Sequence, residues 1–196
     1  RRVPDGLVLY SGFEIMLDAP GSDLSDPRLG LAGSKARLVE YPRRGLPSTA
    51  TEELLRIRGA GLVPVVAHPE RYPGCTSETI AAWRELGAVI QCDAMALLGG
   101  GLMTEFARRM LADGQVDILA SDNHGDRRTL STACLWMSEI GAGAQAAVLT
   151  RDNPGLLLAG KPLAAVEPVT MHRSLFERLR ELIFRPARQA PPEALE

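Results

Sequence analysis

The length, composition and charge of the chain are those of one globular domain with a buried core: 196 residues, of which 45% are hydrophobic and 23% charged. The 22 basic and 24 acidic side chains leave a formal charge of −2, which gives no reason to expect nucleic-acid binding. No apolar run reaches transmembrane length, and the opening residues RRVPDG lack the apolar region of a signal peptide, so we expect neither a membrane span nor a leader.

Strand and helix patterns alternate along the chain. Short apolar runs predict strands over residues 7–17, 36–41, 63–67, 88–92 and 116–120. Apolar residues at helical spacing predict helices over residues 49–58, 78–86, 102–112, 130–137 and 144–149, followed by a short helix from residue 153. This alternation indicates an α/β fold of βα units around a parallel sheet, either open or closed into a barrel.

Capping and turn residues set the expected boundaries of these elements. Thr49 and Glu52 would form a capping box, Ser77 would cap the next helix, and Asn153 with Pro154 would start the short one. The glycine-rich residues 95–101 predict a flexible loop.

One domain boundary is expected, near residue 168. Residues 1–168 would form a single domain, and residues 169–196 would hold an amphipathic helix over 170–184 and a disordered tail. The helix would pack on the domain or on a neighbouring subunit, which leaves a homo-oligomer open.

The three cysteines are far apart in sequence, which argues against a disulfide framework and favours a reducing, cytoplasmic compartment. None begins a C-x₅-R loop, so a cysteine-based phosphatase mechanism has no candidate nucleophile. Cys92 and Cys134 are interpreted as small core residues.

Residues suited to binding metal ions or phosphate stand at the ends of the predicted strands. The strand over 63–67 runs into the sequence HPERY, and the strand over 116–120 runs into SDNH. Because the carboxyl ends of parallel strands share one edge of a sheet, we expect a common metal site there. Its candidate ligands are Glu14, Glu40, His68, Asp122 and His124.

Each candidate also has a simpler interpretation. Either histidine alone would be an ordinary hydrogen-bonded loop residue, whereas both together, with Asp122 two positions from His124, favour a metal site. Glu14 and Glu40 would otherwise form salt bridges to arginine. Carboxylates and imidazoles suit manganese, iron, zinc or magnesium, and the pattern does not choose among these ions.

Arginines in the same loops predict an anionic substrate. Arg71, Arg127 and Arg128 carry guanidinium groups, which recognise phosphate well. The alternative is solvated surface charge. In that alternative Glu70 would pair with one of these arginines, and Tyr72 would simply cover the site.

At these residues the chain resembles the PHP (polymerase and histidinol phosphatase) superfamily. Within it, the chain is similar to the CpsB/CapC-type manganese-dependent protein-tyrosine phosphatases of capsular and exopolysaccharide operons. The matching segments run in family order over residues 5–165: SGFEI, LVEYP, GLVPVVAHPERY, GAVIQ, LASDNH and DNPGLLLAGKPL. AHPERY together with ASD-x-H is a specific combination.

The resemblance implies a distorted (β/α)7 barrel with up to three divalent metal ions at the carboxyl ends of its strands. Glu14 resembles the carboxylate that bridges two metals, and Glu40 and His68 resemble the other ligands of the second. Asp122 resembles a ligand of the first metal and His124 a ligand of the third. The phosphate clamp would be Arg71 with one of Arg127 and Arg128.

The chain departs from the family at its beginning. The family starts with a strand carrying an H-x-H pair, followed by a strand that ends in another histidine, and neither is present here. Five strand segments therefore stand where the family has seven, and the barrel would have two unpaired edges. We expect an upstream segment with these histidines rather than a natural half-barrel.

The main functional hypothesis is a metal-dependent phosphatase acting on phosphotyrosine in a bacterial tyrosine kinase of polysaccharide export. A metal-activated hydroxide would attack phosphorus in line. Two alternatives stay open: a non-catalytic metal- or phosphopeptide-binding module, and a PHP-like hydrolase of a small phosphate ester.

Overall fold

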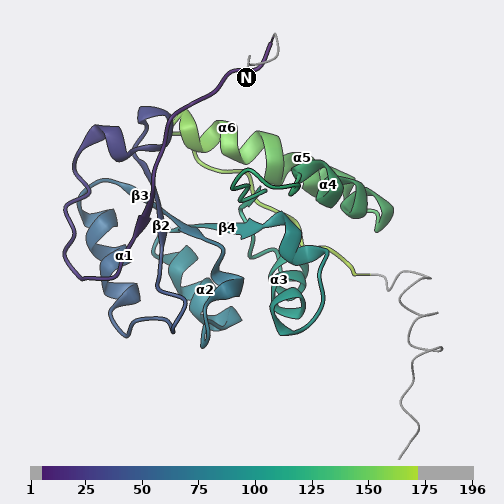
Figure 1. Ribbon diagram of the computed structural model, residues 1–196, viewed down its shortest axis with the longest axis horizontal. Helices are drawn as coiled ribbons and strands as arrows, with labels where there is room; N and C mark the ends of the chain where they lie inside the picture. The colour runs from purple at the N-terminus through teal and green to yellow at the C-terminus, as the bar shows by residue number, and fades with distance from the viewer. Residues whose placement is uncertain (1–5, 172–196) are drawn as a thin grey trace, which may run out of the picture.

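The computed structural model describes residues 6–171, which form a five-stranded parallel sheet with helices packed against it (Figure 1). The strands are β1 (Glu14–Met16), β2 (Ala36–Glu40), β3 (Val63–Ala67), β4 (Val89–Asp93) and β5 (Ile118–Ala120). The α-helices are α1 (Ala50–Gly59), α2 (Ser77–Glu85), α3 (Leu102–Ala112), α4 (Leu130–Glu139), α5 (Gly143–Ala147) and α6 (Asn153–Leu158). Short 3₁₀ helices are η1 (Pro27–Leu29), η2 (Leu31–Gly33), η3 (Pro69–Arg71) and η4 (Ala94–Leu97), and η5 (Val148–Asp152) is a π-helix.

The strands lie side by side in chain order, β1-β2-β3-β4-β5, and every neighbouring pair is parallel. The register places Met16 beside Glu40, and Val66 beside both Val39 and Ile90. The carboxyl ends of β2, β3 and β4 therefore follow one another along one edge of the sheet, where the loops with the predicted site begin.

Two apolar layers cover the sheet, because successive strand residues point to opposite faces. In Figure 1, α1, α2 and α3 lie below the strands and α6 lies above them. Val66 and Ile90 belong to the larger layer, which includes Leu54 of α1, Trp83 of α2 and Met110 of α3. The smaller layer on the other face is formed by Ala36, Val65, Val89, Ile118 and Leu157.

The first strand is much shorter than the predicted residues 7–17. Only Glu14–Met16 pair, and they pair with Leu38–Glu40 of β2 alone. Residues 7–10 have exposed side chains, and Leu9 is 70% exposed. Apolar composition predicted a strand here, but a strand also requires a neighbour, and none of the described residues provides one for this segment.

All three predicted helix caps are wrong, and the first two concern the starts of α1 and α2. Thr49 precedes α1 without a capping hydrogen bond from its side chain, so the capping box with Glu52 does not form. Thr76 caps α2 in place of Ser77, because its extended backbone lets Oγ1 accept from the N–H of Thr79 at 3.2 Å.

Asn153 is also not a cap, since α5, η5 and α6 follow one another directly and its backbone is helical. Its fully buried amide instead donates to the carbonyls of Asp117 and Ala164 and accepts the N–H of Ala164. This side chain ties the segment after α6 to the start of β5.

The remaining predicted elements agree with the structure within about two residues at their ends. The bounds of β3 and α3 match the prediction, whereas the first residues of the expected flexible loop over 95–101 belong to η4, with Ala96 and Leu97 buried. Cys92 is buried as expected and Cys134 is only half-buried. The predicted helix over 170–184 lies outside the described residues, apart from its first two. Within residues 6–171 no helix is long and apolar enough to cross a bilayer.

Candidate metal centre

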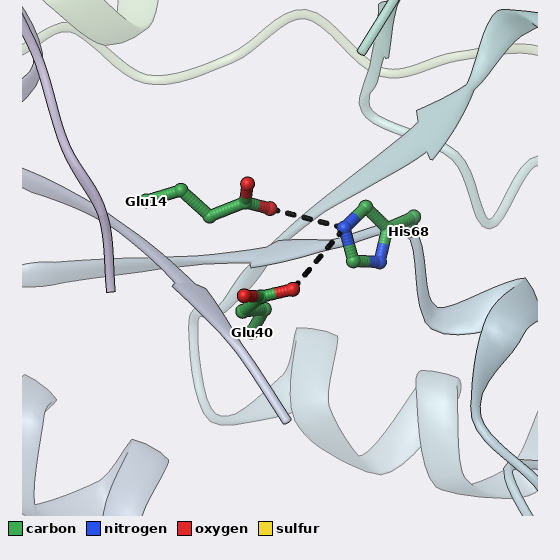
Figure 2. Close-up of side chains that lie close together, drawn as sticks. All are labelled: Glu14, Glu40 and His68. Carbon is green, nitrogen blue, oxygen red and sulfur yellow. Dashed lines mark hydrogen bonds and ion pairs between the residues drawn. The ribbon is translucent and has the colours of Figure 1, made fainter. Parts of the chain in front are cut away.

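Three side chains from neighbouring strands meet at the edge of the sheet (Figure 2). Glu14 begins β1, Glu40 ends β2, and His68 directly follows β3. Nε2 of His68 lies 3.0 Å from Oε1 of Glu14 and 3.6 Å from Oε2 of Glu40. The three candidate ligand atoms all lie within 4.8 Å of one another. The predicted convergence is therefore found for these three residues, although Glu14 opens its strand rather than ending it.

Negative charge predominates in this group. Burial and the charge of Glu14 raise the pKa of Glu40, against the opposing charges of His68 and Arg43. The ion pairs found in residues 6–171 join neither glutamate to an arginine or lysine, so the alternative of a salt bridge to arginine is not found in this part of the chain. Two carboxylates facing one imidazole form a site that a divalent cation would stabilise.

The geometry of these donors fits a metal ion. Zinc, for example, binds imidazole nitrogen and carboxylate oxygen at about 2.0–2.2 Å, which places two ligands of one ion somewhat more than about 3 Å apart. The separations of 3.0 Å and 3.6 Å at His68 Nε2 lie near that value. The side chain of His68 is only 4% exposed, so its ring is held with Nε2 toward the glutamates.

Two of the candidate ligands have strained backbones. His68 has φ of +33° and Asp122 has φ of +45°, and Ala32 is the only other non-glycine residue with positive φ among those described. Such conformations cost about 1–3 kcal/mol and persist where the surrounding structure enforces them. His68 follows β3 and Asp122 follows β5, so both lie in loops at the carboxyl ends of strands. Strain at both positions supports a functional role for each residue.

Tyr72 is buried behind the ligands rather than covering them. It is 3% exposed, and its hydroxyl donates to the carbonyl of Ala67 at 2.7 Å and accepts the N–H of Tyr41 at 3.1 Å. Tyr41 follows Glu40, and Ala67 precedes His68. The phenol therefore joins the two strand ends that carry these ligands and fixes their separation.

Asp122 interacts electrostatically with Glu40 and His68, but its oxygen atoms are engaged elsewhere. Oδ2 accepts Nη2 of Arg71 at 2.5 Å and Nη1 of Arg128 at 3.1 Å. Burial raises the pKa of Asp122, but the hydrogen bond and charge of Arg71 outweigh burial and leave this pKa lowered. The charge of Asp122 also contributes to raising the pKa of Glu40, so the two groups belong to one electrostatic site.

The remaining predicted residues, His124, Arg127 and Arg128, lie in the loop after β5, and they do not all reach the site. Nε2 of His124 lies 3.2 Å from Oδ1 of Asp122, while the His124 side chain is 68% exposed. Arg127 is exposed, and the ion pairs found within residues 6–171 do not include it. The structure thus brings Arg71 and Arg128 together at Asp122 and leaves His124 and Arg127 at the surface.

Two acidic residues beside the site have roles that the sequence did not predict. Asp93 ends β4, is 4% exposed and pairs with Arg71. The alternative in which Glu70 pairs with an arginine is not found among the described residues: its Oε1 accepts the N–H of Asp93 at 2.9 Å, and its Oε2 is buried without a partner there. A predicted fourth strand one residue longer would have placed Asp93 with the other strand-end carboxylates.

Glu70 is expected to make the stability of the protein depend on pH. Burial raises its pKa from 4.5 to about 7, so between those values the folded chain binds a proton that the unfolded chain has released. The free energy of unfolding should therefore fall as pH rises through this window, by about 3 kcal/mol in all. In Glu70→Gln this fall should be absent.

Urea denaturation in the presence of a chelator measures the effect. The variant and the wild type should be similar near pH 4.5 and should diverge near pH 8, where Glu70→Gln is the more stable. Parallel pH dependences of the two proteins would contradict the assignment.

The chain is similar to a family of known proteins. Residues 2–159 match the model of the CpsB/CapC family, described as capsular polysaccharide synthesis. Tyrosine-protein phosphatase YwqE of Bacillus subtilis (strain 168) is 26% identical over 151 residues, which cover 74% of this chain and 59% of that protein. The chain thus spans about three fifths of the length of the curated relative it matches.

A solved structure is similar as well. It belongs to a study of YwqE from Bacillus subtilis and CpsB from Streptococcus pneumoniae, described as unique metal-dependent tyrosine phosphatases. It superposes with a TM-score of 0.61 at 26% identity, covering 74% of this chain and 61% of the other. The family match over most of the chain, together with this shared fold, shows that the protein belongs to the CpsB/CapC family.

Proposed function

We propose that this protein is a metal-dependent phosphatase that hydrolyses phosphotyrosine in a protein substrate. The observation that carries the proposal is the convergence of Glu14, Glu40 and His68 from three neighbouring strands. The CpsB/CapC match and the similarity to proteins described as metal-dependent tyrosine phosphatases support the same reaction. The expected substrate is a bacterial tyrosine kinase of polysaccharide export, in the cytoplasm.

The proposed metal ligands are those predicted from the sequence. Glu14, Glu40 and His68 would hold one divalent ion, with manganese our first choice, and Asp122 and His124 would contribute to neighbouring ions. Such ions would supply an activated water nucleophile and would neutralise charge on the phosphoryl oxygens. The short contact between Asp122 and His124 supports their assignment to adjacent positions.

The arginines would bind and orient the phosphoryl group. Arg71 and Arg128 both contact Asp122, which favours Arg128 over Arg127 as the second member of the phosphate clamp. Guanidinium groups bind phosphoryl oxygens in bidentate fashion and stabilise charge that develops there during transfer. The partly buried setting of Arg71, with its side chain 14% exposed, would strengthen that attraction.

We further propose that the sheet is part of a PHP-type barrel and that residues 1–168 belong to one domain. Strands in unbroken chain order, all parallel, are the arrangement found along the wall of a β/α barrel. The site at the carboxyl ends of β2 and β3 also follows the usual location of active sites in such barrels.

Hydrolysis of p-nitrophenyl phosphate and of a phosphotyrosyl peptide tests the proposed function. We expect turnover with manganese, loss of turnover with a chelator, and recovery when the ion is restored. A panel of small phosphate esters separates a protein phosphatase from a small-molecule hydrolase. Phosphopeptide binding without phosphate release would favour a binding module, and activity insensitive to the chelator would reject the metal-dependent reaction.

A further inference from the structure

Asp93 is held firmly at the end of β4. Its N–H donates to Oε1 of Glu70 at 2.9 Å, and its Oδ1 accepts the N–H of Met95 at 2.9 Å, which caps η4. The residue is 4% exposed. One carboxylate oxygen and the backbone are thus fixed by two neighbouring helical turns, η3 and η4, and Oδ2 is left for another partner.

That partner is Arg71, whose Nη2 donates to Oδ2 of Asp93. Glu70 and Arg71 are consecutive residues of one turn. Glu70 binds the backbone of Asp93, and Arg71 binds its side chain. The same Nη2 of Arg71 also donates to Oδ2 of Asp122 at 2.5 Å. The guanidinium therefore lies between a carboxylate of β4 and a candidate metal ligand of the loop after β5.

We propose that Asp93 is a positioning residue that holds the Arg71 guanidinium at the metal centre in the orientation that binds the substrate phosphoryl group. The inference rests on the proposed phosphatase function for the identity of the bound group. The hydrogen bonds of Arg71 with other described residues use Nη2 alone, so Nη1 and Nε remain as donors for an anion. A guanidinium offers two such N–H groups to phosphate as a fork.

Asp93 rather than Asp122 is the partner suited to this task. The carboxylate of Asp122 is shared among Arg71, Arg128 and His124, and it is itself a candidate metal ligand. Within residues 6–171, Arg71 is the one cation found in an ion pair with Asp93. Asp93 would therefore hold Arg71 in place whatever Asp122 binds.

If Asp93 served only to cap η4, the variant Asp93→Asn would leave Arg71 and substrate binding unchanged. Asparagine keeps the backbone N–H for Glu70 and an oxygen acceptor for Met95, and it removes the charge and the second oxygen acceptor that Arg71 faces. Asp117→Asn is the matched control, because Asp117 is also buried and paired with an arginine, Arg84, but precedes β5 at the opposite end from Asp122.

Nuclear magnetic resonance of protein labelled with ¹⁵N-arginine provides a readout without metal or turnover. The Arg71 signals, assigned with Arg71→Lys, should show slowed rotation of the guanidinium in the wild type and in Asp117→Asn. In Asp93→Asn they should show faster rotation than in the wild type, because Asp122 is then the one described carboxylate that still pairs with Arg71. Unchanged Arg71 signals in Asp93→Asn overturn the inference.

Steady-state kinetics on the manganese-loaded protein provide the second readout. We expect Asp93→Asn to raise KM for p-nitrophenyl phosphate and the inhibition constant of inorganic phosphate about tenfold, with kcat and metal affinity changed far less. Faster rotation of the Arg71 guanidinium in Asp93→Asn, with unchanged KM and inhibition constant, also overturns the inference. Absence of turnover in the wild type would reject the proposed function instead, and the Arg71 signals would then decide the positioning role alone.

Discussion

Replacing His68 by alanine should lower metal affinity, and with it phosphatase turnover, by at least about a hundredfold, because losing an outer-shell partner of a metal ligand alone costs about 10- to 100-fold. His68 supplies the nitrogen donor toward which both glutamates converge. Alanine would leave Glu14 and Glu40 facing each other without that partner, which raises the free energy of any state in which both are ionised.

Metal binding by isothermal titration calorimetry and turnover of p-nitrophenyl phosphate measure the two effects separately. Glu53→Gln is a suitable control, because Glu53 is also buried but binds Gly21 and Arg56, away from the candidate ligands. It should keep wild-type metal affinity. A His68→Ala protein that is folded, as judged by circular dichroism, and still binds manganese as the wild type does would exclude His68 as a ligand.

Much of the fold could be predicted from local pattern. The β-branched run of β3 and the apolar spacing of α3 gave the observed bounds, because each of these segments is long, regular and packed on a core. Prediction failed where a distant partner decides the outcome. Asn153 has the residue type and position of a cap, yet its amide binds Asp117 and Ala164. The sequence around Asn153 does not predict those partners.

The candidate site, like the fold, could be predicted only in part. Parallel strands explain why Glu40 and His68 could be placed together from sequence, since both stand at carboxyl ends that share one edge. The partners of Asp122 could not be foreseen, because they depend on how Arg71 reaches across from another loop. The role of Asp93 depended on a strand boundary, and such boundaries are predicted only to within about 2–4 residues.

The second large effect concerns stability. Replacing Trp83 by alanine should lower the free energy of unfolding by about 3–5 kcal/mol, the usual range for a buried tryptophan. Trp83 is completely buried in α2, its ring lies 5.9 Å from that of Tyr41, and its Nε1 donates to Oγ1 of Thr51 at 3.0 Å. The substitution therefore leaves a cavity between two helices and the end of β2, and it also leaves a hydroxyl without its donor.

Trp136 offers the matched comparison, because it is the other tryptophan of the chain and is only half-buried, with the guanidinium of Arg108 5.1 Å from its ring centre. Trp136→Ala should be clearly less destabilising, since less apolar surface returns to water and the site is better able to collapse. Urea denaturation followed by circular dichroism compares the two. Equal losses would contradict the view that Trp83 anchors α1 and α2 behind the strand end that carries Glu40.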